Sequence, residues 1–87
     1  MAEMSIKRLK AKAKLLYPII RIGKAGLTPS QINEINKSLK KKRLIKIKFL
    51  RPFIEDGSKK SKAEEIAEKT GAVLVEQIGN VVVLYKD

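Results

Sequence analysis

Apolar residues recur along the chain at two different periods, and this alternation predicts where helices and strands lie. The first apolar stripe steps by three and four residues, with lysine and arginine between its members Ile6, Leu9, Ala13 and Leu16. This spacing predicts an amphipathic helix with a basic outer face. A residue before proline is disfavoured in the helical conformation, so the helix is expected to end at Tyr17, before Pro18.

A short strand and a second helix are expected next, joined by a turn that contains glycine. Residues 18–22 are mostly isoleucine, with proline only at the first position, which is typical of a strand. Thr28 is a favourable N-cap, Pro29 suits the first helical position, and Gln31 completes a capping box. The second helix is therefore expected to run from this point to about Arg43.

The middle of the chain predicts one strand and one loop. Residues 44–50 alternate between apolar and basic side chains, which indicates a half-exposed strand with Lys46 and Lys48 on its open face. Residues 51–57 contain proline and an Asp-Gly pair, and these residue types favour a loop.

The last third predicts a helix and a hairpin. Ser61 and Glu64 form a second capping box, and Gly71 is a natural helix terminator. Residues 72–78 and 81–86 are apolar and β-branched, and the Gly-Asn pair between them favours a tight hairpin turn. Both faces of this hairpin are apolar. It is therefore expected either to lie centrally in a sheet or to be covered by a helix on part of its second face.

The predicted order of elements is α-β-α-β-α-β-β, in a single compact domain over residues 1–87. A helical crossover joins the first two strands, so they are expected to be parallel, whereas the hairpin strands are antiparallel. The fold class is therefore α/β (α+β), with one mixed four-stranded sheet and helices packed against it.

Charge changes the picture, because it is large and unevenly distributed. The chain has 20 basic and 9 acidic residues, a net charge of +11. Residues 1–54 carry fifteen basic and two acidic side chains (+13), and residues 55–87 carry five basic and seven acidic ones (−2). A lysine-rich surface that serves solubility would not explain why residues 1–54 have so few acidic side chains to balance the basic ones. The expected partner is a polyanion, above all a nucleic acid.

Several function classes are excluded by what the composition lacks. The chain contains neither cysteine nor histidine, which removes most zinc sites and most nucleophilic triads. Glu64 and Glu65 are adjacent on a predicted helix and do not face each other, so they are a poor acid–base pair. No enzyme activity, cofactor or metal is therefore expected. No apolar run could span a bilayer or act as a signal peptide, and a cytoplasmic protein is expected.

The turn between the first strand and the second helix has the form GxxG, from Gly23 to Gly26. Glycine lets a backbone approach a phosphodiester closely, and the following helix start offers N–H groups and a positive dipole end. Lys24 adds a cation inside the turn. Such a loop clamps single-stranded nucleic acid in KH modules, although the same spacing also occurs in ordinary tight turns. The surrounding charge favours the clamp.

A basic run ends the second helix and precedes the exposed lysines of the next strand. A solvated helix end would explain the run from Lys40 to Arg43, but its proximity in sequence to Lys46 and Lys48 favours one continuous phosphate-binding surface. Phe53, next to Arg51 in the predicted loop, could stack on a base or pack beneath the loop. The chain lacks the aromatic pattern by which RRM domains stack bases on a sheet.

These features, taken in order, resemble the YhbY-like CRM-domain family, whose name refers to chloroplast RNA splicing and ribosome maturation. The resemblance covers roughly residues 5–86 and is carried by the segments Gly23–Thr28, Leu44–Lys48, Thr70–Ala72, Ile78–Gly79 and Val83–Lys86. Many relatives have arginine where this chain has Lys86, which puts only a bidentate contact there in doubt.

The resemblance implies an RNA-binding domain with a fold similar to the C-terminal domain of translation initiation factor three. Stand-alone prokaryotic members look like assembly factors for the large ribosomal subunit, whereas plant members carry several copies and act in group II intron splicing. The single copy here favours the ribosomal role, with rRNA or a large-subunit precursor as partner and a monomeric protein. The candidate RNA-binding residues are Arg21, Gly23, Lys24, Ala25, Gly26, Thr28, Lys40, Lys41, Lys42, Arg43, Lys46, Lys48 and Arg51.

Two other functions are weighed against this one. The basic first helix could lie on an anionic membrane, but its apolar face lacks the Trp or Phe that such helices often use. A general nucleic-acid-binding protein, chromatin-like or an RNA chaperone, would need no ribosomal role. Competition between RNA and DNA would test the latter.

Overall fold

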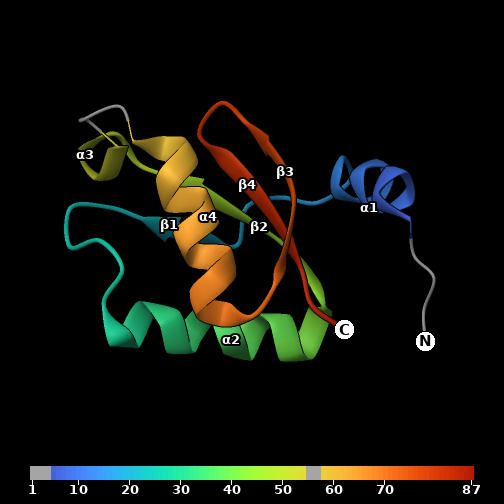
Figure 1. Cartoon of the computed structure of the whole chain (residues 1–87), viewed down its shortest axis with the longest axis horizontal. Helices are drawn as coiled ribbons and strands as arrows, with labels where there is room; N and C mark the ends of the chain where they lie inside the picture. Colours follow the sequence, from blue (N-terminus) through green and yellow to red (C-terminus); the bar gives the residue numbers. More distant parts are fainter. Residues whose placement is uncertain (1–4, 55–57) are drawn as a thin grey trace.

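The computed structural model describes residues 5–54 and 58–87. In chain order its elements are α1 (Ile6–Ala13), β1 (Ile20–Ile22), α2 (Pro29–Lys42), β2 (Leu44–Phe49), α3 (Arg51–Ile54), α4 (Lys59–Thr70), β3 (Val73–Ile78) and β4 (Val81–Tyr85). Figure 1 shows α2 and α4 crossing each other beside the sheet, with α1 at the opposite end of the molecule from α3.

The strands form one mixed sheet in the order β1-β2-β4-β3. β1 is parallel to β2, and both β2 and β3 pair antiparallel with β4. The predicted fold class and strand directions are confirmed. The hairpin turn is confirmed as well, since Gly79 has a positive φ of 57° between β3 and β4.

The main core lies between the sheet and the helices α2 and α4. Alternate residues of β2 point into it: Ile45, Ile47 and Phe49 are at most 1% exposed. Ile35 and Leu39 of α2 and Ile66 of α4 join the same cluster. The buried face of β2 confirms its predicted alternation, and the apolar side of α2 packs on the same face of the sheet.

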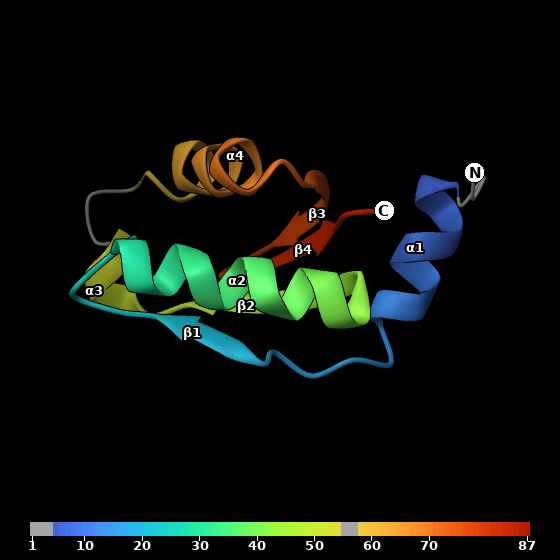
Figure 2. The same ribbon diagram turned by 90° about the horizontal axis from the view of Figure 1, so that it is seen from below.

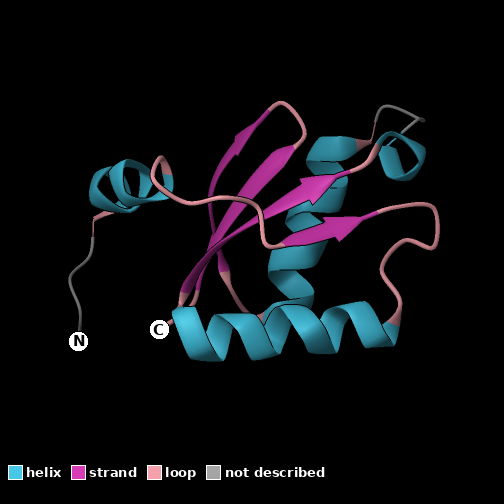
Figure 3. Ribbon diagram, turned by 180° about the vertical axis from the view of Figure 1, so that it is seen from behind, coloured by secondary structure: helices cyan, strands magenta, loops and turns pink. Residues whose placement is uncertain are grey.

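A second, smaller core lies on the other face of the sheet. Leu9 and Ala13 of α1 pack there against Val75 and Val83. The second explanation for the apolar hairpin therefore holds, because α1 covers part of its second face; the first holds for β4 alone, since β3 is an edge strand. Figures 2 and 3 show α1 at one end of the molecule, away from α4. The α1–β1 connection covers a further part of this face, where the Leu16 carbonyl accepts from Lys46 Nζ.

The first helix ends four residues earlier than predicted. Its C-cap is Lys14, and the N–H of Leu16 donates to the carbonyl of Ala13 at 3.0 Å in a tighter final turn. Beyond this turn the chain runs towards β1, and the Leu16 carbonyl accepts from Lys46 Nζ at 3.1 Å instead of continuing the helical pattern. β1 itself begins at Ile20, although the N–H of Ile19 already donates to the Lys46 carbonyl at 3.1 Å.

Two further boundaries were predicted wrongly. Residues 51–54 form the short helix α3 rather than part of a loop, because Pro52 is compatible with a first helical turn and Phe53 is buried in the core. Residues 55–57 of the predicted loop lie outside the described residues. α4 begins at Lys59 with Ser58 as N-cap, so Ser61 is an exposed residue within the helix and forms no capping box. Its predicted end is confirmed, with Gly71 left-handed at φ 68°.

Candidate nucleic-acid interface

The GxxG turn is a closed loop at the carboxyl end of β1. The Gly26 N–H donates to the Gly23 carbonyl at 2.9 Å, which closes the turn, and Gly26 has a φ of 73°. That backbone conformation is accessible to glycine at little cost. Lys24 and Ala25 occupy the tip, and both are exposed. The loop therefore presents a cation and a small side chain to solvent on a fixed backbone.

The base of the loop rests on the segment that leads into α3. A Cβ on Gly23 would lie 3.3 Å from Leu50 Cδ1, and one on Gly26 would lie 3.7 Å from Phe53 Cε1. The Leu50 N–H donates to the Ile22 carbonyl at 2.8 Å, which ties the ends of β1 and β2 together. Figure 1 shows the loop and α3 at the same end of the molecule.

The start of α2 follows the loop and is capped by its own residues. The Thr28 hydroxyl accepts from the Gln31 N–H at 3.1 Å, which confirms Thr28 as the N-cap. The Thr28 carbonyl accepts from the Ile32 N–H at 3.0 Å, and Pro29 has no N–H to offer. The helix start thus contributes its dipole end, but fewer free N–H groups than a bare helix terminus would.

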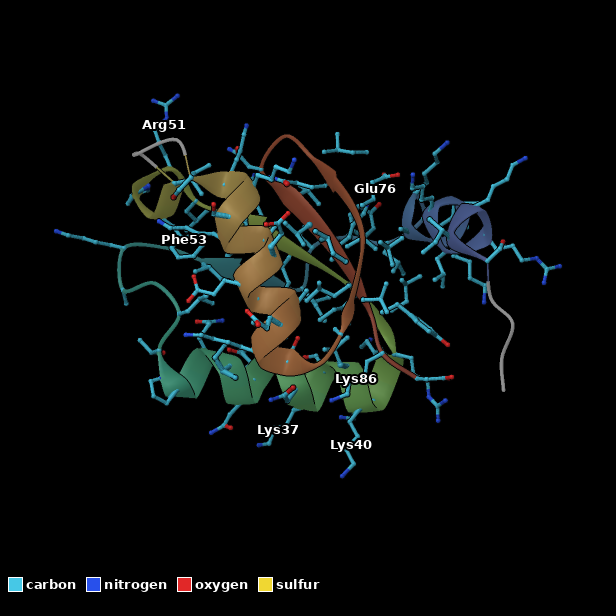
Figure 4. All side chains as sticks on the ribbon, viewed as in Figure 1. Lys37, Lys40, Arg51, Phe53, Glu76 and Lys86 are labelled. Atoms are coloured by element: carbon cyan, nitrogen blue, oxygen red, sulfur yellow. The ribbon has the colours of Figure 1, made fainter. Side chains whose placement is uncertain are left out.

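Four cations surround this end of the sheet, and we call them the loop-end patch: Arg21, Lys24, Lys48 and Arg51. Arg21 and Lys48 are in register on the parallel strands β1 and β2. Both are exposed on the face opposite α2, since their neighbours Ile20, Ile22, Ile47 and Phe49 fill the main core. None of the four makes an ion pair among residues 5–54 and 58–87. Figure 4 shows Arg51 extending into solvent from α3.

The second basic group predicted from the sequence, Lys40 to Arg43, lies at the other end of α2. A helix of 14 residues is about 21 Å long, so this group is that far from the GxxG loop. α2 also packs on the face of the sheet opposite to Lys46 and Lys48. Lys42 nevertheless lines a cleft together with Leu16, whose carbonyl accepts from Lys46 Nζ, so the predicted continuous surface linking Lys40–Arg43 to the strand lysines stays a prediction.

Lys46 differs from Lys48, although both were predicted to be exposed. Lys48 is exposed, but Lys46 is half-buried, and its Nζ donates to the Leu16 carbonyl at 3.1 Å. The connection between α1 and β1 crosses β2 at this point and accepts the lysine. Lys46 thus holds a structural contact that no local sequence pattern could reveal.

Separate substitutions of these two lysines are expected to have different consequences. Lys48→Ala should weaken RNA binding without changing the melting temperature, because its side chain is exposed and makes no ion pair with the residues that the structure describes. Lys46→Ala should lower the free energy of unfolding by about 1 kcal/mol, because it removes a hydrogen bond to a half-buried carbonyl. Thermal melts monitored by circular dichroism would measure the difference. Equal melting temperatures for the two variants would contradict the assignment.

A groove of about 730 Å³ lies where α2, α4 and the C-terminus meet. Its basic lining residues are Lys40, Arg43, Lys69 and Lys86. Carboxylates offset them: Arg43 pairs with Asp87 at 3.7 Å, and Lys69 pairs with Glu65 at 3.0 Å. Lys86 donates to the Thr70 carbonyl at 2.9 Å, which caps the end of α4. Figure 4 shows Lys37, Lys40 and Lys86 on this side of the molecule. The groove suits a polyanion less well than the loop-end patch does.

Two aromatic side chains near these surfaces, Phe53 and Tyr85, do not offer an open ring on which a base could stack. Phe53 is 7% exposed and packs edge-to-face on Phe49 with ring centroids 5.1 Å apart. It therefore packs beneath the loop rather than presenting its ring to a base. Burial, and then a hydrogen bond to Asp87 at 3.1 Å, raise the pKa of the Tyr85 hydroxyl above its usual value. Tyr85 therefore remains a neutral, half-buried side chain.

Features of other function classes are not found in the part of the chain that the structure describes. No cluster of three or more acidic or metal-ligating side chains occurs within residues 5–54 and 58–87. None of the helices in those ranges is long and apolar enough to cross a bilayer.

The chain matches the family model of the CRS1/YhbY (CRM) domain over residues 1–86. It is 38% identical over 79 residues to the probable RNA-binding protein YqeI of Bacillus subtilis, covering 91% of this chain and 80% of that protein. It is 32% identical over 80 residues to a probable RNA-binding protein of Methanocaldococcus jannaschii, covering 92% of this chain and 59% of the relative. The solution structure of a hypothetical protein from Staphylococcus aureus is similar with a TM-score of 0.77 and 34% identity, over 94% of this chain and 83% of that one.

Proposed function

Because the chain belongs to the CRS1/YhbY (CRM) domain family, we propose that it is an RNA-binding protein whose GxxG loop and loop-end patch contact the RNA backbone. The relatives from Bacillus subtilis and Methanocaldococcus jannaschii are both named as RNA-binding proteins, which supports the proposal. The observation that carries it is the patch itself: four exposed cations, none with an ion-pair partner among residues 5–54 and 58–87, surround a glycine turn whose tip is open to solvent.

The binding mode follows from this geometry. The exposed turn allows a phosphodiester to approach the backbone at Gly23–Gly26, and Lys24 supplies a charge at the contact. Arg21 and Lys48, side by side on adjacent strands, continue the positive surface along the sheet. Phosphate contacts of this kind set position and affinity but carry no base sequence, so binding through the patch alone is expected to be sequence-tolerant.

We further propose that the RNA is ribosomal and that the protein acts as a cytoplasmic monomer during assembly of the large subunit. The resemblance to stand-alone members of the family supports this role. Crosslinking in cells, followed by sequencing of the bound RNA, would test it. Recovery of mature or precursor large-subunit rRNA is the expected result, and a broad sample of unrelated RNA would favour the general nucleic-acid-binding alternative.

Salt dependence of the affinity tests the electrostatic basis of the proposal. Each phosphate contact contributes about −0.7 to −0.9 to the slope of log K against log salt. Four cations in the patch therefore predict a slope of about −3 or steeper for a labelled single-stranded RNA, measured by fluorescence anisotropy. A slope near zero would reject the proposal. Equal or tighter binding of a DNA duplex of the same length would favour the chromatin-like alternative.

A further inference from the structure

The connection between α1 and β1 carries a cluster of exposed apolar side chains that the sequence analysis did not single out. Leu15 is 83% exposed, Tyr17 85% and Ile19 45%. Beside them lies a cleft of about 220 Å³, lined by Leu15, Leu16, Tyr17, Ile19, Lys42 and Leu44. Tyr17 thus combines an almost fully exposed side chain with a place in a cleft whose other lining residues are mostly aliphatic.

This segment is held in place at both ends of the exposed cluster. The Leu16 N–H donates to the Ala13 carbonyl at 3.0 Å, and the Leu16 carbonyl accepts from Lys46 Nζ at 3.1 Å. The Ile19 N–H donates to the Lys46 carbonyl at 3.1 Å. Pro18 further restricts the backbone between these anchors. The backbone at Tyr17 is thus held in place before binding, so the entropic cost of ordering this segment around a ligand is small.

The charge around the cleft limits what could occupy it. Among the described residues, its lining includes one charged side chain, Lys42, and no carboxylate. Lys42 belongs to the basic last turn of α2, and Lys14 is exposed just before Leu15. A purely apolar partner would leave these cations uncompensated. The matching ligand combines a flat apolar face with a nearby negative charge, and an unpaired nucleotide has both.

We propose that Tyr17, with Leu15 and Ile19 beside it, is a stacking platform for an unpaired RNA base, and that Lys42 contacts the phosphate of the same nucleotide. The inference rests on the proposed RNA binding and adds a base-contacting site to the phosphate-contacting loop. Single-stranded RNA is commonly held by stacking on aromatic side chains next to cations. The site lies near the end of α2 that is remote from the GxxG loop.

The test compares Tyr17→Ala with Tyr17→Phe, which keeps the ring. The probe is a labelled, unstructured RNA of about 12 nucleotides, within the range that such surfaces bind. Tyr17→Ala should weaken binding by about 5- to 100-fold, the loss expected for one stacked base. The salt slope should stay unchanged, since no charge is lost, and Tyr17→Phe should bind like wild type. Lys42→Ala should instead reduce the slope by about 0.7.

A matched probe with the same sugar–phosphate backbone but without bases separates stacking from other effects. Wild type and Tyr17→Ala should bind this abasic probe equally well, and both should melt at the same temperature because Tyr17 is so exposed. If wild type binds neither probe, the proposed RNA binding itself fails. If wild type binds the base-containing RNA and Tyr17→Ala binds it equally, or loses as much affinity for the abasic probe, the stacking site is overturned.

Discussion

A protein in which Lys24 and Ala25 are both replaced by aspartate is expected to lose RNA affinity by at least about tenfold while it folds normally, since juxtaposed like charges cost several kcal/mol. The substitutions place two carboxylates at the tip of the turn, where phosphates would approach the backbone. Lys24 and Ala25 are exposed and pack on nothing in the core, and aspartate is well tolerated in turns. Affinity would be measured by anisotropy at one salt concentration, and stability by thermal melting.

A control must change the net charge by the same amount elsewhere. Lys7→Asp with Ala11→Asp uses the same residue types and also takes the charge from +11 to +8. Both positions are exposed on α1, at the opposite end of the molecule from the GxxG loop. This control should lose only the small affinity expected from a weaker overall field. Equal affinities for the loop variant and the control would reduce the loop to an ordinary tight turn on a diffusely basic protein.

Local patterns predicted those parts of the fold in which each residue's role depends on its neighbours in sequence. The buried face of β2 follows from strict alternation, and the start of α2 follows from Thr28 and Pro29. The predicted capping box is incomplete, because the Thr28 N–H donates to the Gly26 carbonyl and the Gln31 side chain donates to Glu34. Boundaries set by distant contacts were missed. α1 ends where the following turn meets Lys46, whose Nζ donates to the Leu16 carbonyl, and α3 forms where Phe53 reaches the core.

The candidate site shows the same division. The GxxG loop could be predicted, because its glycines lie between a recognisable strand and a recognisable helix start. Arg21 and Lys48 lie side by side because β1 and β2 are neighbouring strands in this register. The hydrogen bond of Lys46 depends on where the α1–β1 connection crosses the sheet. The exposure of Tyr17 is likewise a tertiary property. A signal was present in the aromatic residue before Pro18, but sequence alone could not tell an exposed ring from a buried one.

Phe53 links the core to the loop, so its truncation is expected to affect both. Its ring is 7% exposed, packs edge-to-face on Phe49, and lies 3.7 Å from the position of a Cβ on Gly26. Lys62 Nζ also lies 4.4 Å from the ring centroid and donates to the Phe53 carbonyl. Removing the ring would therefore leave a cavity directly beneath the GxxG turn.

Phe53→Ala is expected to lower the free energy of unfolding by about 3 kcal/mol, the loss typical of a truncated core aromatic. For a domain of this size the melting temperature should fall by about 12–24 °C. At a temperature where the variant is still folded, RNA affinity should also fall several-fold, because the turn has lost its support. Phe53→Leu, which refills most of the volume, should cost only about 1 kcal/mol and bind RNA nearly as well as wild type. If Phe53 instead stacked on a base, Phe53→Ala would lose affinity at an unchanged melting temperature, and the role assigned here would be wrong.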